Sequence, residues 1–390
     1  MERNKKITAI VFVILFIIEI AVLGAASFVK LVNFYVNDET DYNEWSANLG
    51  NKFETDEATS FYKKFQFVNL NGAVRNLFGQ QEMNGVQKLN NGYLTLKMKK
   101  TSDESLQEYA DNVKKLSNYL EGQGKKLLYV TTPYTVSKYD EELPIGVEDY
   151  GNNNIDRFLA LLDSEGIAAM DLRELIHTDN IDQYTMMYKT DHHWTTRAGF
   201  YAYCKLEDYL TQIFQCDVDS RIGDINNYNI EVYEKWHLGS NGQRTGIYFA
   251  GIDDFELIVP KFETTIQREK TIGTMQELVY NRKPLQNKEY TSRYTYDYVL
   301  DAALGNYRNL DCKNDLKILI VTDSYGKAVN PFLIMGFSEV RFLYNRESQQ
   351  LTKDYIDSYC PDIVILMYYP DFLAEGSLAF QFQGFGDEEQ

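Results

Sequence analysis

The chain begins with an apolar run from residue 7 to residue 29, which is interrupted by one charged residue, Glu19. Three basic residues precede this run within the first six positions. About 20 apolar residues suffice for a helix to span a bilayer, and the basic residues predict a cytoplasmic N-terminus. A cleaved signal peptide is the alternative, because residues 24–27 read Gly-Ala-Ala-Ser, but the run is long for a signal peptide. We therefore expect a retained single-pass anchor in the cell membrane and an extracytoplasmic body.

Beyond residue 102 the apolar positions switch between helical spacing and strand-like runs. Apolar residues recur at helical spacing from Leu106 to Leu120, and the apolar stretch 126–130 follows as a buried strand. A helix at 155–162 and a strand at 167–172 repeat this order. Further strands are expected at 316–321, 340–343 and 363–367. This alternation predicts an α/β fold in which helices flank a parallel sheet.

The pattern changes between about residues 220 and 300. This segment is rich in Tyr, Thr, Ile and Val, and it contains glycines at 239, 242, 246 and 251 that are typical of turns. We interpret it as a β-rich insertion. We thus expect three parts: a cytoplasmic tip and transmembrane anchor at 1–32, a stalk and lead-in at 33–102, and an α/β domain at 103–390. The β-rich insertion at about 220–300 belongs to this domain.

The composition is that of a folded acidic protein. The 390 residues include 30 tyrosines and 22 phenylalanines, and the formal net charge is −18. Such a chain is not disordered, and its charge argues against binding to nucleic acid, which requires a basic surface. The four cysteines, Cys204, Cys216, Cys312 and Cys360, form no CxxC pair. We expect free thiols, although an exported location permits disulfides.

Two stretches combine the residue types of a nucleophile and its base. Asp191-His192-His193 places two of the four histidines beside a carboxylate, in a loop that precedes a helix. Ser324 follows a buried strand and precedes another helix, a position that projects a hydroxyl beyond the end of a sheet. In an extended loop residues i and i+2 face the same way. Asp191 can therefore hold one ring nitrogen of His193 while the other faces Ser324, which predicts a Ser-His-Asp triad.

Each of these residues also has an ordinary structural explanation. Serine is common in a turn after a strand, and the Asp-His-His stretch can cap the following helix or lie in the core. A zinc site is a third option, since Asp and His are zinc ligands. However, the stretch lacks His-x-x-x-His spacing, and His177 and His237 are distant in sequence. We therefore expect no metal and no other cofactor.

Residues 190–194, Thr-Asp-His-His-Trp, resemble the motif that names the DHHW family of bacterial exported proteins. The runs at 239–246 and 250–254 also resemble that family. An Asp-x-His pair that precedes a downstream Asp-Ser is similar to the alginate O-acetyltransferases of the SGNH hydrolase superfamily. The resemblance implies an SGNH-hydrolase-like fold for residues 103–390.

The resemblance also implies roles for six positions. The nucleophile, the general base and the carboxylate that orients it would be Ser324, His193 and Asp191. Oxyanion and substrate contacts would come from Gly326, Arg346 and Tyr368.

The function implied is that of a membrane-anchored extracytoplasmic O-acyltransferase, with acetyl as the expected group, which modifies a cell-envelope polysaccharide through an acyl-enzyme. The implied partners are the polysaccharide, an acyl donor and a multi-spanning membrane acyltransferase. A carbohydrate acetylesterase with the same triad is one alternative. The other is a non-catalytic glycan-binding or assembly protein on the same fold, which a Ser324–His193 separation above about 6 Å would favour.

Overall fold

The computed structural model describes residues 63–140, 142–290, 295–344 and 350–385, together with residues 17, 21 and 25. The chain divides into two units, Met1–Asn71 and Gly72–Gln390, and helix α4 (Lys64–Leu77) crosses the division. Within the described ranges, every helix is too short or too polar to span a bilayer. The apolar run 7–29, which carries the predicted anchor, lies outside the described residues apart from three single positions.

A small antiparallel sheet lies in the predicted lead-in. Its strands β1 (Glu82–Met83), β2 (Val86–Lys88) and β3 (Leu94–Leu96) pair in this order. Asn84 and Gly85 form the turn between β1 and β2, with φ angles of 52° and 77°. Asn and Gly adopt this left-handed conformation at the lowest cost. This part of the lead-in is therefore folded.

The main sheet of the second unit has, among the described residues, eight strands in the order β5-β4-β13-β11-β12-β10-β8-β9. The first five are parallel to one another, whereas the last three join antiparallel. The predicted parallel sheet is thus corrected to a mixed sheet. A two-residue turn joins β8 to β9, which requires antiparallel pairing, and β10 pairs antiparallel with both β8 and β12. The bounds are β4 (Lys126–Thr131), β5 (Ala169–Asp171), β8 (Ile266–Arg268), β9 (Thr271–Gly273), β10 (Asn306–Asn309), β11 (Lys317–Thr322), β12 (Glu339–Tyr344) and β13 (Ile363–Tyr368).

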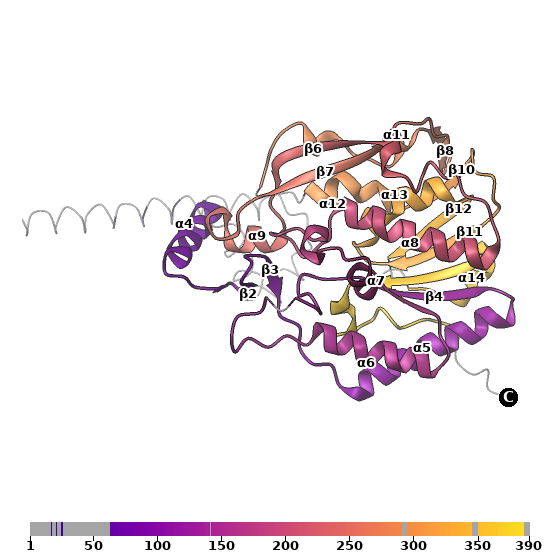
Figure 1. Ribbon diagram of the computed structural model, residues 1–390, viewed down its shortest axis with the longest axis horizontal. Helices are drawn as coiled ribbons and strands as arrows, with labels where there is room; N and C mark the ends of the chain where they lie inside the picture. The colour runs from indigo at the N-terminus through magenta and orange to yellow at the C-terminus, as the bar shows by residue number, and fades with distance from the viewer. Residues whose placement is uncertain are drawn as a thin grey trace, which may run out of the picture. The chain divides into compact units, whose positions relative to one another are not determined.

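Helices cover both faces of this sheet (Figure 1). On one face lie α5 (Asp103–Gly122), α6 (Gly151–Ser164) and α14 (Lys353–Tyr359), and on the other lie α8 (Thr196–Phe214) and α13 (Gly326–Gly336). A seven-residue helix, α7 (Leu172–Thr178), follows β5 directly. The described chain also contains short 3-10 helices: η1 (Gln183–Met186), η2 (Ile225–Asn227), η3 (Lys283–Leu285), η4 (Asp301–Ala303) and η5 (Pro370–Leu373). The predicted α/β architecture is confirmed.

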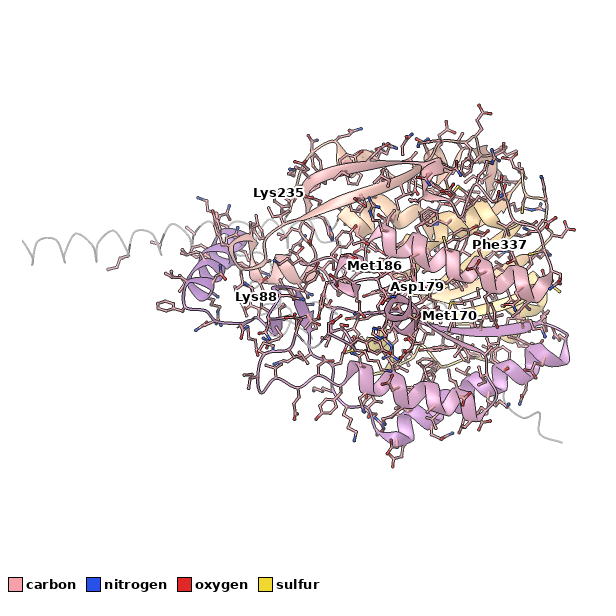
Figure 2. All side chains as sticks on the ribbon, viewed as in Figure 1. Lys88, Met170, Asp179, Met186, Lys235 and Phe337 are labelled. Atoms are coloured by element: carbon pink, nitrogen blue, oxygen red, sulfur yellow. The ribbon has the colours of Figure 1, made fainter. Side chains whose placement is uncertain are left out.

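The described core consists of two clusters, one on each face of the sheet. In β11, Ile318 and Ile320 belong to the cluster under α8 and α13, whereas Leu319 and Val321 belong to the cluster under α5 and α6. Successive side chains of a strand point to opposite faces, so a strand with two covered faces must be apolar throughout. Phe337, which follows α13 and is labelled in Figure 2, is buried in the first cluster.

Helices α8 and α13 approach each other closely through small residues. A Cβ atom on Gly199, in the first turn of α8, would lie 2.3 Å from the carbonyl oxygen of Ala328 in the first turn of α13. The loop with Asp191 and His193 precedes α8, and the turn with Ser324 precedes α13. The helix contact therefore brings the two predicted catalytic stretches together.

The predicted β-rich insertion is only partly β-structure. Its long strands β6 (Tyr228–His237) and β7 (Asp253–Pro260) form an antiparallel ribbon. Between and after them lie the short helices α9 (Ser240–Thr245), α10 (Ile247–Ala250), α11 (Met275–Leu278) and α12 (Thr295–Leu300). Gly246 and Gly251 end α9 and α10 at φ angles of 80° and 83°. These two glycines therefore end short helices and not strands, because a glycine with positive φ ends a helix as readily as it turns a strand.

Substitution of Gly199 by leucine should lower the free energy of unfolding by about 2–3 kcal/mol, because the side chain would meet the backbone of Ala328. Gly122 at the end of α5 is the matched control, since an added Cβ there meets nothing within 4 Å. Gly122→Ala should leave the stability unchanged or raise it by up to about 1 kcal/mol. Denaturant unfolding of the full chain measures both, and a Gly199→Leu variant as stable as the wild type would contradict this packing.

Candidate active site

Ser324 lies in a tight turn between β11 and α13. The buried carboxylate of Asp323 accepts hydrogen bonds from the N–H of Tyr325 at 2.7 Å and from the N–H of Tyr369 at 2.5 Å. Tyr369 follows β13, the strand next to β11 in the sheet. These bonds fix the turn at the carboxyl ends of two parallel strands, the edge at which α/β sheets bind their ligands.

His193 contacts Ser324 directly. Its Nε2 lies 2.7 Å from the Ser324 Oγ, although the two residues are 131 positions apart in the chain. Tyr296 stacks on the imidazole with ring centroids 4.3 Å apart, and its hydroxyl donates to the Ser324 carbonyl at 3.0 Å. The separation above about 6 Å that would favour a non-catalytic scaffold is not found.

The loop that carries His193 is closed by local hydrogen bonds. The N–H of Tyr188 donates to the His193 carbonyl at 3.2 Å, and the Thr195 side chain caps α8. The indole N–H of Trp194 donates to the Tyr325 carbonyl at 2.9 Å. Trp194 therefore connects this loop to the turn that carries Ser324.

The carboxylate of Asp191 is fully buried behind His193. Its Oδ1 lies 3.3 Å from His193 Nδ1, but the two atoms do not align as a hydrogen bond. Oδ1 accepts well-formed bonds from the His192 N–H at 2.7 Å and from the Ser240 hydroxyl at 2.9 Å. Oδ2 lies 2.9 Å from the Nε2 of His237, which donates to it. Donors from two distant segments thus surround this carboxylate.

His237 and Ser240 are the site residues that sequence reasoning missed. They come from the insertion, where His237 ends β6 and Ser240 begins α9. Gly239 lies between them, and a Cβ on it would be 2.2 Å from the Cβ of Asp191. One signal was available, because the glycine-rich run 239–246 shares in the family resemblance and His237 lies two residues before it. The sequence alone could not place this run against Asp191.

The protonation states of Asp191 and His193 suit base catalysis. Burial raises the pKa of Asp191, but the charge of His193 and the hydrogen bonds from His192 and His237 outweigh burial and hold the pKa well below 3.8. Burial and the charge of His192 lower the pKa of His193 below 6.5. Burial also lowers the pKa of His192, but the hydrogen bond and the charge of Asp191 raise it overall. At neutral pH His193 is therefore uncharged and can accept the proton of Ser324.

Gly326 does not join the triad in the described structure. The N–H of Gly326 donates to the Asp323 carbonyl at 3.1 Å, so it closes the turn and does not point to a substrate. Within the described residues, the N–H of Ser324 has no acceptor and is the open donor of this turn. Arg346 lies outside the described residues.

Tyr368 is placed in the core cluster on the opposite face of the sheet, and the prediction of a substrate contact is corrected. It is buried there, and its hydroxyl donates to the Ala379 carbonyl at 3.0 Å. The next residue, Tyr369, faces the site, with its ring 4.9 Å from that of Tyr325 and 5.6 Å from that of His192. Because side chains alternate along a strand, an error of one residue reverses the face.

The metal alternative concerns the same loop. Asp191, His192 and His193 offer ligand atoms that lie within 4.8 Å of one another. However, the Ser240 hydroxyl lies 2.9 Å from Asp191 Oδ1 and 2.8 Å from His192 Nδ1, and His193 Nε2 faces Ser324. These protein partners favour the triad interpretation.

Residues 93–212 match the family model described as SGNH hydrolase-like domain, acetyltransferase AlgX. The SGNH-like segment includes Asp191 and His193 and ends before Ser324. Among curated proteins, none matches this chain in sequence.

Solved structures with low sequence identity share the SGNH-like fold. Bacillus cereus PatB1 has a TM-score of 0.61 at 18% identity, over 74% of this chain and 96% of its own. PatB1 with a sulfonyl adduct has a TM-score of 0.59 at 18% identity, over 78% of this chain and 99% of its own. A DHHW family protein from Eubacterium siraeum has a TM-score of 0.57 at 17% identity, over 77% of this chain and 95% of its own. The resemblance to the DHHW family and to SGNH-type acetyltransferases is confirmed.

Covalent labelling of Ser324 by a serine-reactive phosphonate should remain fast at mildly acidic pH. Because burial and the charge of His192 lower the pKa of His193, the neutral base persists below the ordinary histidine value of about 6.5. The labelling rate should therefore fall only when the pH drops below that value. Rates measured between pH 4.5 and 8.5 give the midpoint, and a midpoint at or above about 7 would contradict the assignment of His193 as a buried neutral base.

Proposed function

We propose that this chain is a serine-dependent O-acyltransferase, with acetyl as the transferred group, that modifies a polysaccharide of the cell envelope. The observation that carries the proposal is the 2.7 Å contact between Ser324 Oγ and His193 Nε2, with Asp191 Oδ1 3.3 Å from the other ring nitrogen. The match to the acetyltransferase AlgX model over residues 93–212 supports the reaction class.

In the first half-reaction, His193 takes the hydroxyl proton of Ser324 while Oγ attacks the carbonyl carbon of the acyl donor. The N–H of Ser324, which has no acceptor in the described part of the chain, would donate to the oxyanion that forms. The bond between the acyl carbon and the donor oxygen then breaks, and the leaving group takes the proton from His193. An acyl ester on Ser324 results.

In the second half-reaction, a sugar hydroxyl of the polysaccharide replaces the leaving group. His193 removes the proton of that hydroxyl, the sugar oxygen attacks the ester carbonyl, and Ser324 leaves with the proton. Water in the same place would give hydrolysis, so the occupant of the acceptor position decides between transferase and esterase. The acetyltransferase match supports transfer.

We place this reaction outside the cell membrane, with the apolar run 7–29 as an anchor. A multi-spanning membrane acyltransferase would deliver the acyl group to the donor side of the site. Attachment to the same membrane would favour this transfer, because tethering raises the effective concentration of the two proteins. This part of the proposal rests on the sequence and on the family resemblance.

Ser324→Ala should abolish labelling by a sulfonyl fluoride and reduce acetyl transfer from an activated acetyl ester by about 10³-fold or more, since no nucleophile remains. A sulfonyl probe is suitable because PatB1, which shares the fold, has been described with a sulfonyl adduct. Ser358→Ala is the matched control, since that hydroxyl donates to the Tyr355 carbonyl in α14. Mass spectrometry measures the labelled fraction of each chain. Undiminished labelling of Ser324→Ala would remove Ser324 from the mechanism.

Addition of an oligosaccharide acceptor should divert the acetyl group from water to sugar. With an activated acetyl ester as donor, we expect O-acetylated oligosaccharide to form and the release of free acetate per turnover to fall. Both products are measured in the same reaction, and a metal chelator should change neither. Free acetate as the sole product, whatever the acceptor, would favour the acetylesterase alternative.

A further inference from the structure

The β6–β7 ribbon and the start of α9 contact the triad at Asp191. His237, at the end of β6, has no exposed surface, and its Nε2 lies 2.9 Å from Asp191 Oδ2. Ser240, at the start of α9, contacts the other oxygen of the same carboxylate at 2.9 Å. The insertion therefore supplies a donor to each oxygen of Asp191.

The other strand of the ribbon, β7, binds Thr190, the loop residue that precedes Asp191. Asp253 in β7 is paired with His237 in the ribbon register. The carboxylate of Asp253 accepts hydrogen bonds from the Thr190 N–H at 2.8 Å and from the Thr190 hydroxyl at 2.6 Å. Thr190 and Asp191 are thus held by two facing residues of one ribbon.

We propose that His237 is a positioning residue of the triad, which donates its Nε2–H to Asp191 Oδ2 and thereby keeps Oδ1 turned toward His193. The proposal rests on the proposed function, because it concerns how the same nucleophile is activated.

The direction of the hydrogen bond follows from the chemistry of the two groups. An ionised carboxylate only accepts hydrogen bonds, so the Nε2 of His237 carries the proton. Bonds to both oxygens fix the rotation of the carboxylate plane, whereas donors to Oδ1 alone would leave that rotation free. The Asp191–His193 contact of 3.3 Å is not a well-directed hydrogen bond, so it cannot fix the rotation. The orientation of the base is therefore set from the insertion.

Two aromatic rings pack near the imidazole of His237. The ring lies 4.6 Å from that of Tyr188 and 6.4 Å from that of Phe255. Apolar contacts on these sides would also tolerate a phenyl ring of similar shape. A substitution can therefore remove the donor while it preserves most of the packing.

The test compares three substitutions at this position in the full chain. His237→Phe fills the site without a donor and should lower kcat for acetyl transfer by about 10–100-fold, the range expected when a hydrogen bond to a charged group is lost. His237→Gln places an amide nitrogen the same number of bonds from Cα as Nε2 and should keep kcat within about threefold of the wild type. His237→Asn is one bond too short and should resemble the phenylalanine variant. The KM for the acetyl donor should stay within about twofold in all three, because the donor acts on the base and not on the substrate.

The control is His177→Phe, because His177 stacks on Tyr139 away from the triad and should keep the wild-type kcat. A folded His237→Phe variant with kcat within about twofold of the wild type would overturn the proposal. If that variant does not fold, the glutamine and asparagine variants decide, and equal kcat values for these two would overturn it as well. A wild-type chain that neither transfers acetyl nor reacts with the sulfonyl fluoride would instead refute the proposed function, which distinguishes the two failures.

Discussion

The burial of the Asp191 carboxylate is the constraint on which the site depends. An ionised carboxylate removed from water costs several kcal/mol unless hydrogen bonds and nearby positive charge compensate for it. Here the His192 N–H, the Ser240 hydroxyl and the His237 imidazole donate to its two oxygens. The carboxylate stays ionised because the charge of His193 and the hydrogen bonds from His192 and His237 hold its pKa well below 3.8. A charged orienting group next to an uncharged imidazole is the arrangement that a serine nucleophile needs.

This constraint explains why the insertion belongs to the active site. The donors to Asp191 come from positions 192, 237 and 240, so the loop and the ribbon must meet at close range. A glycine at 239 permits this approach, because any side chain would overlap with Asp191. The insertion, which composition identifies only as β-rich, therefore supplies hydrogen bonds that hold the carboxylate of Asp191.

The sheet provides the second requirement, which is a rigid support for the nucleophile. Asp323 links the Ser324 turn to the end of β13, and the close contact of Gly199 with Ala328 aligns the starts of α8 and α13. Tyr296 adds a third support, since its ring stacks on His193 while its hydroxyl binds the Ser324 carbonyl. The nucleophile and its base are thus positioned by packing that is independent of any substrate.

Local sequence determined the parts of this protein that depend on periodicity and short-range geometry. The helix at Leu106–Leu120, the buried strands at 126–130, 316–321 and 363–367, and the Asp-x-His loop followed by a capped helix all follow from patterns within about 20 residues. Tertiary structure alone decided which face Tyr368 and Tyr369 occupy, that β8, β9 and β10 run antiparallel, and that His237 binds Asp191 across 46 positions. The physical reason is that a strand direction, a sheet face and a long-range hydrogen bond are set by the burial of both partners at once, which no local pattern of apolar and polar residues records.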